Sequence, residues 1–178
     1  WIDGMMEATD GYVTSWDVVN EALSGADKDG DGKFDLQSAK RGNVSAADAK
    51  NNFYWQDYLG DIEYVRTAVA AARKSFAAHN GDPDKLKLFI NDYNLETAYD
   101  QNKKLESLIH WIEEWEKDGI TKIDGIGSQM HVTCSMDPAK QKENEEAYVN
   151  MLKLMVASGK GKLVRISELD MGLEDMNG

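Results

Sequence analysis

The chain has 178 residues, enough for one domain with a sizeable core, and its 42% hydrophobic and 29% charged residues are typical of folded proteins. The formal net charge of −12 disfavours nucleic acid and anionic membrane surfaces as partners, because both need clustered Lys and Arg; a neutral polymer is compatible. The single cysteine excludes an internal disulfide framework. No apolar run approaches the roughly 20 residues of a membrane-spanning helix.

Strand and helix patterns alternate along the chain. Residues 1–6 resemble the end of a helix that leads into the first strand. Apolar runs predict buried strands at residues 15–20, 86–91, 123–132 and 163–169. The intervening periodicity predicts helices within residues 54–79, 97–117 and 138–158. This order indicates βαβ units and therefore a parallel sheet.

Every predicted strand ends in polar side chains. These ends are Asn20-Glu21, Asn91-Asp92-Tyr93-Asn94, Gln129-Met130-His131 and Glu168-Leu169-Asp170. They favour a (β/α)8 TIM barrel over an open doubly wound sheet, because barrel enzymes place catalytic residues at the carboxyl ends of several strands. A dinucleotide-binding fold would need a glycine-rich turn that opens a helix, but Gly125-Ile126-Gly127 lies inside a strand. A whole barrel takes about 250 residues, so the predicted domain, residues 1–178, is a partial barrel with about half of the strands.

Glu21 and Glu168 form the candidate catalytic pair. Hydrolysis of a glycosidic bond needs a proton for the leaving oxygen and a negative group near the developing cation, and paired carboxylates supply both. Asn20 would point an amide into the same pocket. His131 would donate a hydrogen bond to Glu168, with Asp170 orienting its ring, and such a donor favours the ionised carboxylate. Either glutamate alone would suggest only a solvated loop residue.

These four strand ends resemble a known family, glycoside hydrolase family 10, the endo-β-1,4-xylanases. The similar segments are residues 16–21, 89–94, 125–131 and 166–170, which match strands four to seven of the family's barrel in order. The resemblance implies hydrolysis of xylan or xylo-oligosaccharides by a retaining mechanism without a cofactor. Glu21 would be the general acid/base and Glu168 the nucleophile, with their carboxyl groups roughly 5–5.5 Å apart.

The resemblance also implies roles for the neighbouring residues. Asn20, Gln129 and His131 would line the sugar site, and Asp170 would support His131. Asp17, Asn91 and Tyr93 would stand behind these residues or form the wall of the cleft.

The family's Lys, His and Trp residues on early strands and its late Trp residues have no counterpart here. We therefore expect the segment to require the missing portions of the same barrel. Another retaining β-glycosidase of the same clan, such as a cellulase, remains an alternative, as does a non-catalytic carbohydrate-binding or calcium-binding fragment. The substrate class suggests an extracellular, cell-surface or periplasmic protein, with any leader outside this segment.

One loop has features of a calcium site. Oxygen-bearing positions alternate in the set Asp27, Asp29, Asp31, Lys33 and Asp35, with Gly32 at the sixth place, as in an EF-hand loop. The twelfth place is Ser38 instead of Glu, and no helix pattern precedes the loop. A solvated Asp-Gly turn is therefore an alternative to a structural Ca²⁺ site.

Three tryptophans lie in the predicted helical segments. Trp55, Trp111 and Trp115 could be sugar platforms, but on barrel helices we expect them to pack against the sheet or its outer layer.

Overall fold

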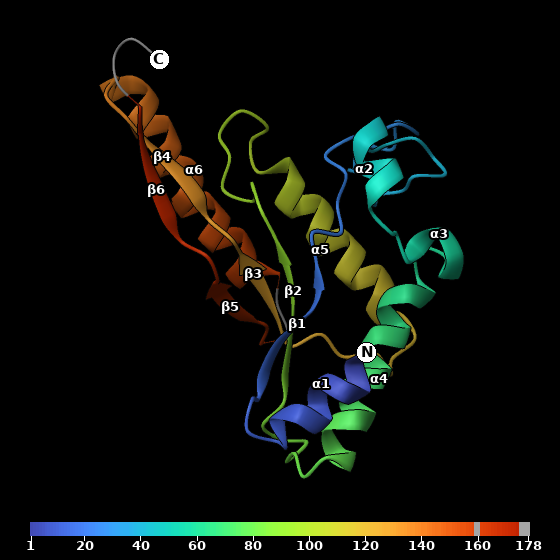
Figure 1. Cartoon of the computed structure of the whole chain (residues 1–178). Coiled ribbons are helices and arrows are strands. Elements are labelled where there is room, and N and C mark those ends of the chain that lie inside the picture. The colour runs from blue at the N-terminus through green and yellow to red at the C-terminus, as the bar shows by residue number, and fades with distance from the viewer. Residues whose placement is uncertain (159–160, 175–178) are drawn as a thin grey trace.

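The main sheet is a curved, parallel, four-stranded wall (Figure 1). The computed structural model describes residues 1–158 and 161–174, so six residues of the predicted domain, 159–160 and 175–178, lie outside the described residues. The strands, in sheet order, are β1 (Ser15–Asn20), β2 (Lys87–Asp92), β3 (Gly125–Ser128) and β5 (Leu163–Ile166). The parallel α/β arrangement confirms the predicted fold class.

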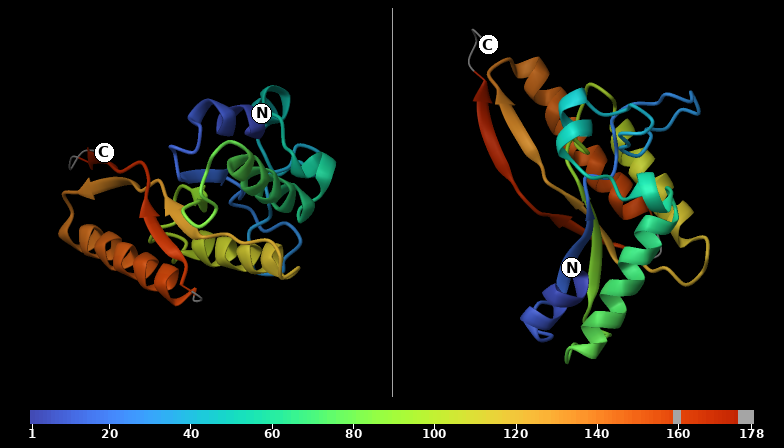
Figure 2. Two further views of the ribbon diagram at one scale, coloured as in Figure 1. Left: turned by 90° about the horizontal axis from the view of Figure 1, so that it is seen from below. Right: turned by 45° about the vertical axis from the view of Figure 1, so that its right-hand side comes forward.

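The longer helices cover one face of this wall, and the short ones stand away from it (Figures 1 and 2). The longer ones are α1 (Ile2–Thr9), α4 (Glu63–Ala78), α5 (Lys103–Glu116) and α6 (Pro138–Ala157), and the short ones are α2 (Ala46–Asn51) and α3 (Gln56–Leu59). Alternate residues of β2, Leu88 and Ile90, are fully buried in the core with Val65 and Phe76 of α4. The side chains between them point to the other face, because successive side chains of a strand alternate.

The other face of the sheet is concave, as two contacts between distant strands show. Arg165 on β5 pairs with Asp17 on β1 and donates to the Ser15 hydroxyl at 3.0 Å, although β1 and β5 are the outer strands of the sheet. Its guanidinium also lies 4.5 Å from the ring centre of Phe89 on β2. The sheet therefore curls around these side chains as a segment of a barrel wall.

The glycines of β3 make room on this concave face. A Cβ atom at Gly125 would overlap the Phe89 ring, and one at Gly127 would overlap the side-chain oxygen of Asn91. Both side chains come from β2. The close approach of neighbouring side chains thus explains why two glycines stand in a buried strand.

The prediction that residues 123–132 and 163–169 each form one continuous strand is wrong. The segment 123–132 is interrupted at Gln129 and Met130, where Met130 adopts a left-handed φ of 52°, and the chain resumes as β4 (His131–Ser135). The segment 163–169 ends at Ile166 and resumes as β6 (Asp170–Glu174). β4 and β6 pair in parallel as a separate ribbon beyond the main sheet (Figure 1).

The predicted helix at 54–79 is also divided. α3 stops at Gly60, whose φ of 81° suits glycine, and α4 begins at Glu63. The helix predicted from residue 97 begins only at Lys103, because Gln101 and Asn102 have φ values of 57° and 61° that interrupt a helix. Among the described residues, no helix has the length and apolar character needed to cross a bilayer.

The tryptophans behave differently from one another. Trp115 is fully buried, donates to the Asp61 carbonyl at 2.8 Å and stacks against Trp111, as expected for helix residues facing the core. Trp55 does not pack as predicted, because it is 62% exposed. It lies before α3, in a segment that stands away from the sheet.

Candidate active site

Glu21 is the first residue after β1, and its backbone is held by two hydrogen bonds. Its N–H donates to the Asn91 carbonyl and its carbonyl accepts from the Gln37 side chain, both at 2.8 Å. Its φ of 54° lies in the left-handed region, which is unfavourable for a residue with a side chain. Such a conformation persists where surrounding contacts over-determine it, and it is common at functional sites.

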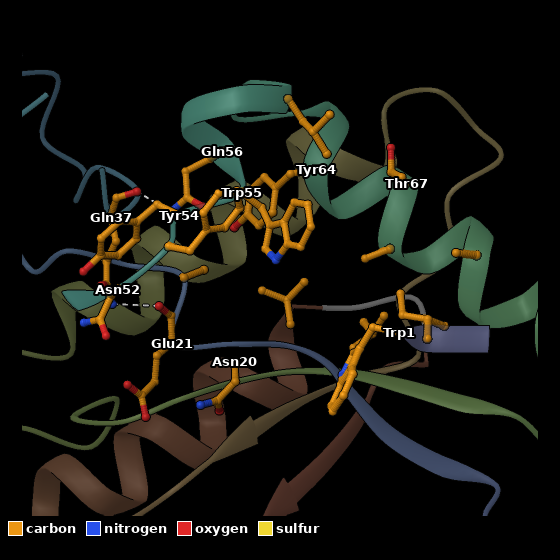
Figure 3. Close-up of a pocket in the computed structure, with 18 of the residues that line it drawn as sticks. Trp1, Asn20, Glu21, Gln37, Asn52, Tyr54, Trp55, Gln56, Tyr64 and Thr67 are labelled. Carbon is orange, nitrogen blue, oxygen red and sulfur yellow. Dashed lines mark hydrogen bonds between the residues drawn. The ribbon is translucent and has the colours of Figure 1, made fainter. Parts of the chain in front are cut away.

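An open pocket of about 860 Å³ adjoins Glu21 and Asn20. Figure 3 shows both residues at one side of this pocket, with Trp55 and Tyr54 on the other and Trp1 near its end. The remaining lining includes residues of β1, α1 and α4. The exposed indole of Trp55 therefore faces this pocket.

The Glu21 carboxylate is bound by Gln129, which follows β3. The Gln129 amide nitrogen donates to Glu21 Oε1 at 2.8 Å and lies 3.4 Å from Asn20 Oδ1. The Gln129 backbone N–H donates to the Asp92 carbonyl at 3.0 Å. Gln129 is 3% exposed, so its amide is fixed between the ends of β1 and β2.

Glu168 lies two residues after β5 and is approached by two side chains. Asn91 Nδ2 donates to Glu168 Oε1 at 3.2 Å, and His131 Nε2 lies 3.5 Å from Glu168 Oε2. The same Asn91 amide donates to Asn20 Oδ1 at 2.9 Å, while its oxygen accepts from the Ser167 hydroxyl at 2.7 Å. Asn91 thus connects the two predicted catalytic regions.

His131 completes a second connection between the carboxylates. Its Nε2 lies 3.1 Å from Gln129 Oε1, and its Nδ1 lies 3.0 Å from Asp170 Oδ2. The hydrogen bond to Asp170 raises the pKa of His131, and the negative charges of Asp170 and Glu168 act in the same direction. A protonated imidazole donates from both nitrogens, which suits the acceptors on its two sides.

Seven of the nine predicted catalytic, sugar-binding and supporting residues share this network. They are Asn20, Glu21, Asn91, Gln129, His131, Glu168 and Asp170. Asp17 lies deeper on the concave face, paired with Arg165; burial raises the pKa of Asp17, and Arg165 opposes that rise. The ring of Tyr93 lies beneath the Lys104 ammonium, outside the hydrogen-bonded set.

Sequence reasoning assigned no role to Arg165, Ser167 and Lys104. Ser167 lies within a strand-end motif and Arg165 lies directly before it, so their positions in the sequence could have predicted that they lie near the site. Lys104 lies in the first turn of a helix, where a lysine is ordinarily solvated. Lys104 is nevertheless only 3% exposed, and the pattern of apolar residues in its helix does not predict this burial.

The acidic loop brings three of the five proposed calcium ligands together. One oxygen each from Asp27, Asp29 and Asp31 lies within 4.8 Å of the others, and the Asp35 carboxylate does not belong to that group. Asp27 accepts from the Gly30 and Gly32 N–H groups and from Lys103 Nζ. These bonds occupy its carboxylate in the manner of an Asp-Gly turn, and calcium binding stays a prediction.

Known proteins share this sequence and fold. The family model described as Glycosyl hydrolase family 10 matches residues 1–177. Endo-1,4-beta-xylanase 2 of Claviceps purpurea is 33% identical over 162 residues, which are 90% of this chain and 37% of that protein. The structure of a thermostable mutant of the xylanase Xyn10A from Cellvibrio japonicus aligns with a TM-score of 0.63 and 29% identity, covering 96% of this chain and 41% of that one.

A further solved structure is that of a xylanase A mutant from P fluorescens subsp. cellulosa in complex with xylopentaose. It aligns with a TM-score of 0.62 and 29% identity, over 96% of this chain and 41% of that chain. The chain therefore spans about two fifths of the length of these relatives. With a family model that covers nearly every residue, the chain belongs to glycosyl hydrolase family 10.

Proposed function

We propose that this chain contributes both catalytic carboxylates of an endo-β-1,4-xylanase, which hydrolyses the xylan backbone with retention of configuration. One observation carries the proposal: Glu21 and Glu168, from the ends of two strands at opposite edges of the curved sheet, are linked through Gln129 and His131. The xylanase relatives and the xylopentaose complex of one of them support the choice of substrate.

In the first step, the Glu21 carboxyl protonates the glycosidic oxygen while the Glu168 carboxylate attacks the anomeric carbon. The carbon–oxygen bond to the leaving sugar breaks, and a covalent bond to Glu168 forms. Glu21, now a carboxylate, remains hydrogen-bonded to the Gln129 amide. This amide donor orients the Glu21 carboxyl group.

In the second step, Glu21 takes a proton from a water molecule, whose oxygen attacks the same carbon and releases Glu168. Two inversions give net retention, so the product keeps the β configuration. Only side chains and water take part, and the mechanism requires no cofactor.

His131 and Asn91 would stabilise Glu168 in its ionised form. Asn91 donates to one of its oxygens, and protonated His131 lies beside the other. Both effects lower the free energy of the carboxylate that must attack and later leave. Asn20, held by Asn91, would present the rest of its side chain to the sugar next to the cleaved bond.

The chain would act as part of a complete barrel and outside the cytoplasm. The need for a complete barrel is supported by the pocket beside β1 and by the exposed side chains of Ile166, at the end of β5, and Leu169, because neighbouring barrel strands would cover them. The location outside the cytoplasm rests on the substrate, since a long polysaccharide does not cross a membrane unaided.

The test uses a complete barrel that contains this chain, incubated with xylan, cellulose and xylopentaose. We expect release of xylo-oligosaccharides, with the β anomer appearing first in proton NMR spectra, and no release by a folded Glu168→Ala variant. Initial release of the α anomer would contradict the retaining mechanism. Cleavage of cellulose alone would favour the cellulase-like alternative, and binding without cleavage would favour the non-catalytic one.

A further inference from the structure

A buried ion pair lies directly behind the candidate site. Asp92, the last residue of β2, is fully buried, and Lys104 in the first turn of α5 has a side chain only 4% exposed. The Lys104 ammonium donates to Asp92 Oδ1 at 2.8 Å and lies 3.5 Å from the ring centre of Tyr93. Neither side chain belongs to the network that joins Glu21 to Glu168.

The Asp92 carboxylate holds the backbone that follows Glu21. Its Oδ2 accepts from the Leu23 N–H at 3.2 Å, and its Oδ1 accepts from the Tyr93 N–H at 2.9 Å. The preceding residue, Asn91, accepts the Glu21 N–H through its carbonyl. Two successive residues of β2 therefore anchor two backbone N–H groups on either side of Ala22, which stabilises the left-handed conformation of Glu21.

The Lys104 ammonium stabilises the ionised form of the buried Asp92 carboxylate. Burial raises the pKa of Asp92, and the charge and hydrogen bond of Lys104 are the largest opposing effects. A buried carboxylate that loses its cation is strongly destabilised and takes up a proton instead. The Tyr93 ring adds a cation–π contact on another side of the ammonium.

Other titratable groups surround this pair. Tyr93 and Glu96 come from the loop after β2, Glu21 from the end of β1, and Tyr64 from α4. Glu96 is 2% exposed, accepts from the Ser128 hydroxyl at 3.3 Å, and has a pKa that burial raises. The charge of Lys104 thus acts on two buried carboxyl groups, Asp92 and Glu96, and His131 also acts on Glu96.

We propose that Lys104 is a positioning residue for the acid/base carboxylate Glu21, acting through the Asp92 carboxylate and the Leu23 N–H. Lys104 itself does not touch the sugar. The inference rests on the proposed function, because it assigns Glu21 the role of acid and base.

The variant Lys104→Met, made in the complete barrel, removes the charge and keeps much of the side-chain volume. Without the cation the pKa of Asp92 rises further, so Asp92 becomes protonated as the pH falls and holds the Leu23 N–H less firmly. We expect the acidic limb of the kcat profile to move to higher pH. We also expect kcat on xylan near pH 6 to fall about 10- to 100-fold, the effect of weakening one buried charge-assisted contact, with little change in KM.

Three matched variants complete the test. The double variant Lys104→Met/Asp92→Asn has no buried charge at this pair, so its acidic limb should return to the wild-type position and part of kcat should recover. Lys104→Arg keeps the positive charge, so the acidic limb of its kcat profile should stay at the wild-type pH. Lys103→Met removes the neighbouring ammonium, which binds Asp27 in the surface loop, and should leave the profile unchanged.

An unchanged limb in Lys104→Met, or an equal loss of kcat at every pH with no recovery in the double variant, would overturn the inference. If Lys104→Met does not fold, by circular dichroism, the double variant and Lys104→Arg still decide it, since both avoid an unpaired buried charge. Absence of hydrolysis by the wild-type barrel would contradict the proposed function instead.

Discussion

The segments that follow the two candidate catalytic carboxylates have very different surroundings. After Glu21 the chain enters the core, where Ala22 is 3% exposed and Leu23 is fully buried. After Glu168 the chain stays at the surface, where Leu169 and Met171 are 61% and 63% exposed. Glu168 itself has a side chain 46% exposed.

Because of this difference, the two carboxylates are held in place by different kinds of contact. Glu21 is fixed largely through the backbone, because its own N–H and carbonyl and the Leu23 N–H bind β2 and Gln37, and Gln129 holds its carboxylate in addition. Glu168 is fixed by its side chain, through Asn91 and His131. We therefore expect the geometry at Glu21 to be set largely within this chain, and that at Glu168 to depend more on the strand that would cover β5 and β6.

Replacing each carboxylate by alanine should have the largest effects and should separate the two regions chemically. On xylan, Glu168→Ala and Glu21→Ala should each lower kcat on the order of 10⁴-fold or more, as for removal of a central catalytic group. An aryl xyloside with a good leaving group needs no proton, so its first step should survive in Glu21→Ala and not in Glu168→Ala. Pre-steady-state release of the aryl alcohol measures this step, and equal losses in both variants would contradict the assigned roles.

Gly127→Ala should disturb the link between the two regions. Its Cβ would displace Asn91, which binds Asn20 on one side and Glu168 on the other. Overpacking of this kind costs about 1–3 kcal/mol of unfolding free energy, and kcat should fall as well. Denaturant unfolding and xylan hydrolysis measure the two effects.

Gly4→Ala is the control, because a Cβ at Gly4 in α1 meets no atom within 4 Å apart from its chain neighbours and the backbone of its own helix. It should be neutral or stabilise by up to about 1 kcal/mol, since alanine favours a helix. A Gly127→Ala variant that matched this control would show that β3 can move away from Asn91.

Asp170→Asn should weaken the Glu168 region more than the Glu21 region, which His131 reaches only through Gln129. Asp170 is the main cause of the raised pKa of His131, so the variant should lower that pKa toward its ordinary value. His131 would then lose its proton at a lower pH, and the alkaline limb of the kcat profile should move to lower pH. NMR titration of the His131 ring checks the shift directly, and an unchanged ring titration would contradict the role of Asp170.

Asp137→Ala should have the smallest effect. Asp137 caps α6, which packs against β4, by accepting from the Ala139 N–H at 2.8 Å. Loss of an N-cap lowers the unfolding free energy by about 1 kcal/mol. Thermal unfolding measures this change, whereas kcat/KM on xylan should stay within about twofold of the wild-type value if the cap serves stability only.

The sequence predicted the barrel segment and the main groups at the site because both depend on short-range patterns. Apolar runs that end in Asn20-Glu21 or Glu168 identify strand ends, and parallel strands bring such ends together. The interruption at Met130 was not predictable, because nothing in the run of residues 123–132 marks this methionine for its left-handed backbone. Lys104 was also missed, since its burial depends on Asp92 and Tyr93 rather than on the pattern of its own helix.

The acidic loop after β1 has a consequence for engineering. Its ends are joined by the Asp35 N–H, which donates to the Ala26 carbonyl at 2.7 Å, and Phe34 is tied to α5 through Ser107 and Trp111. The residues between are exposed or half-buried, and Glu21 is held by other bonds. Loops of this kind tolerate insertion well. A peptide tag or a whole folded module placed between Gly30 and Gly32 would thus extend away from the barrel and leave the Glu21 carboxylate in place.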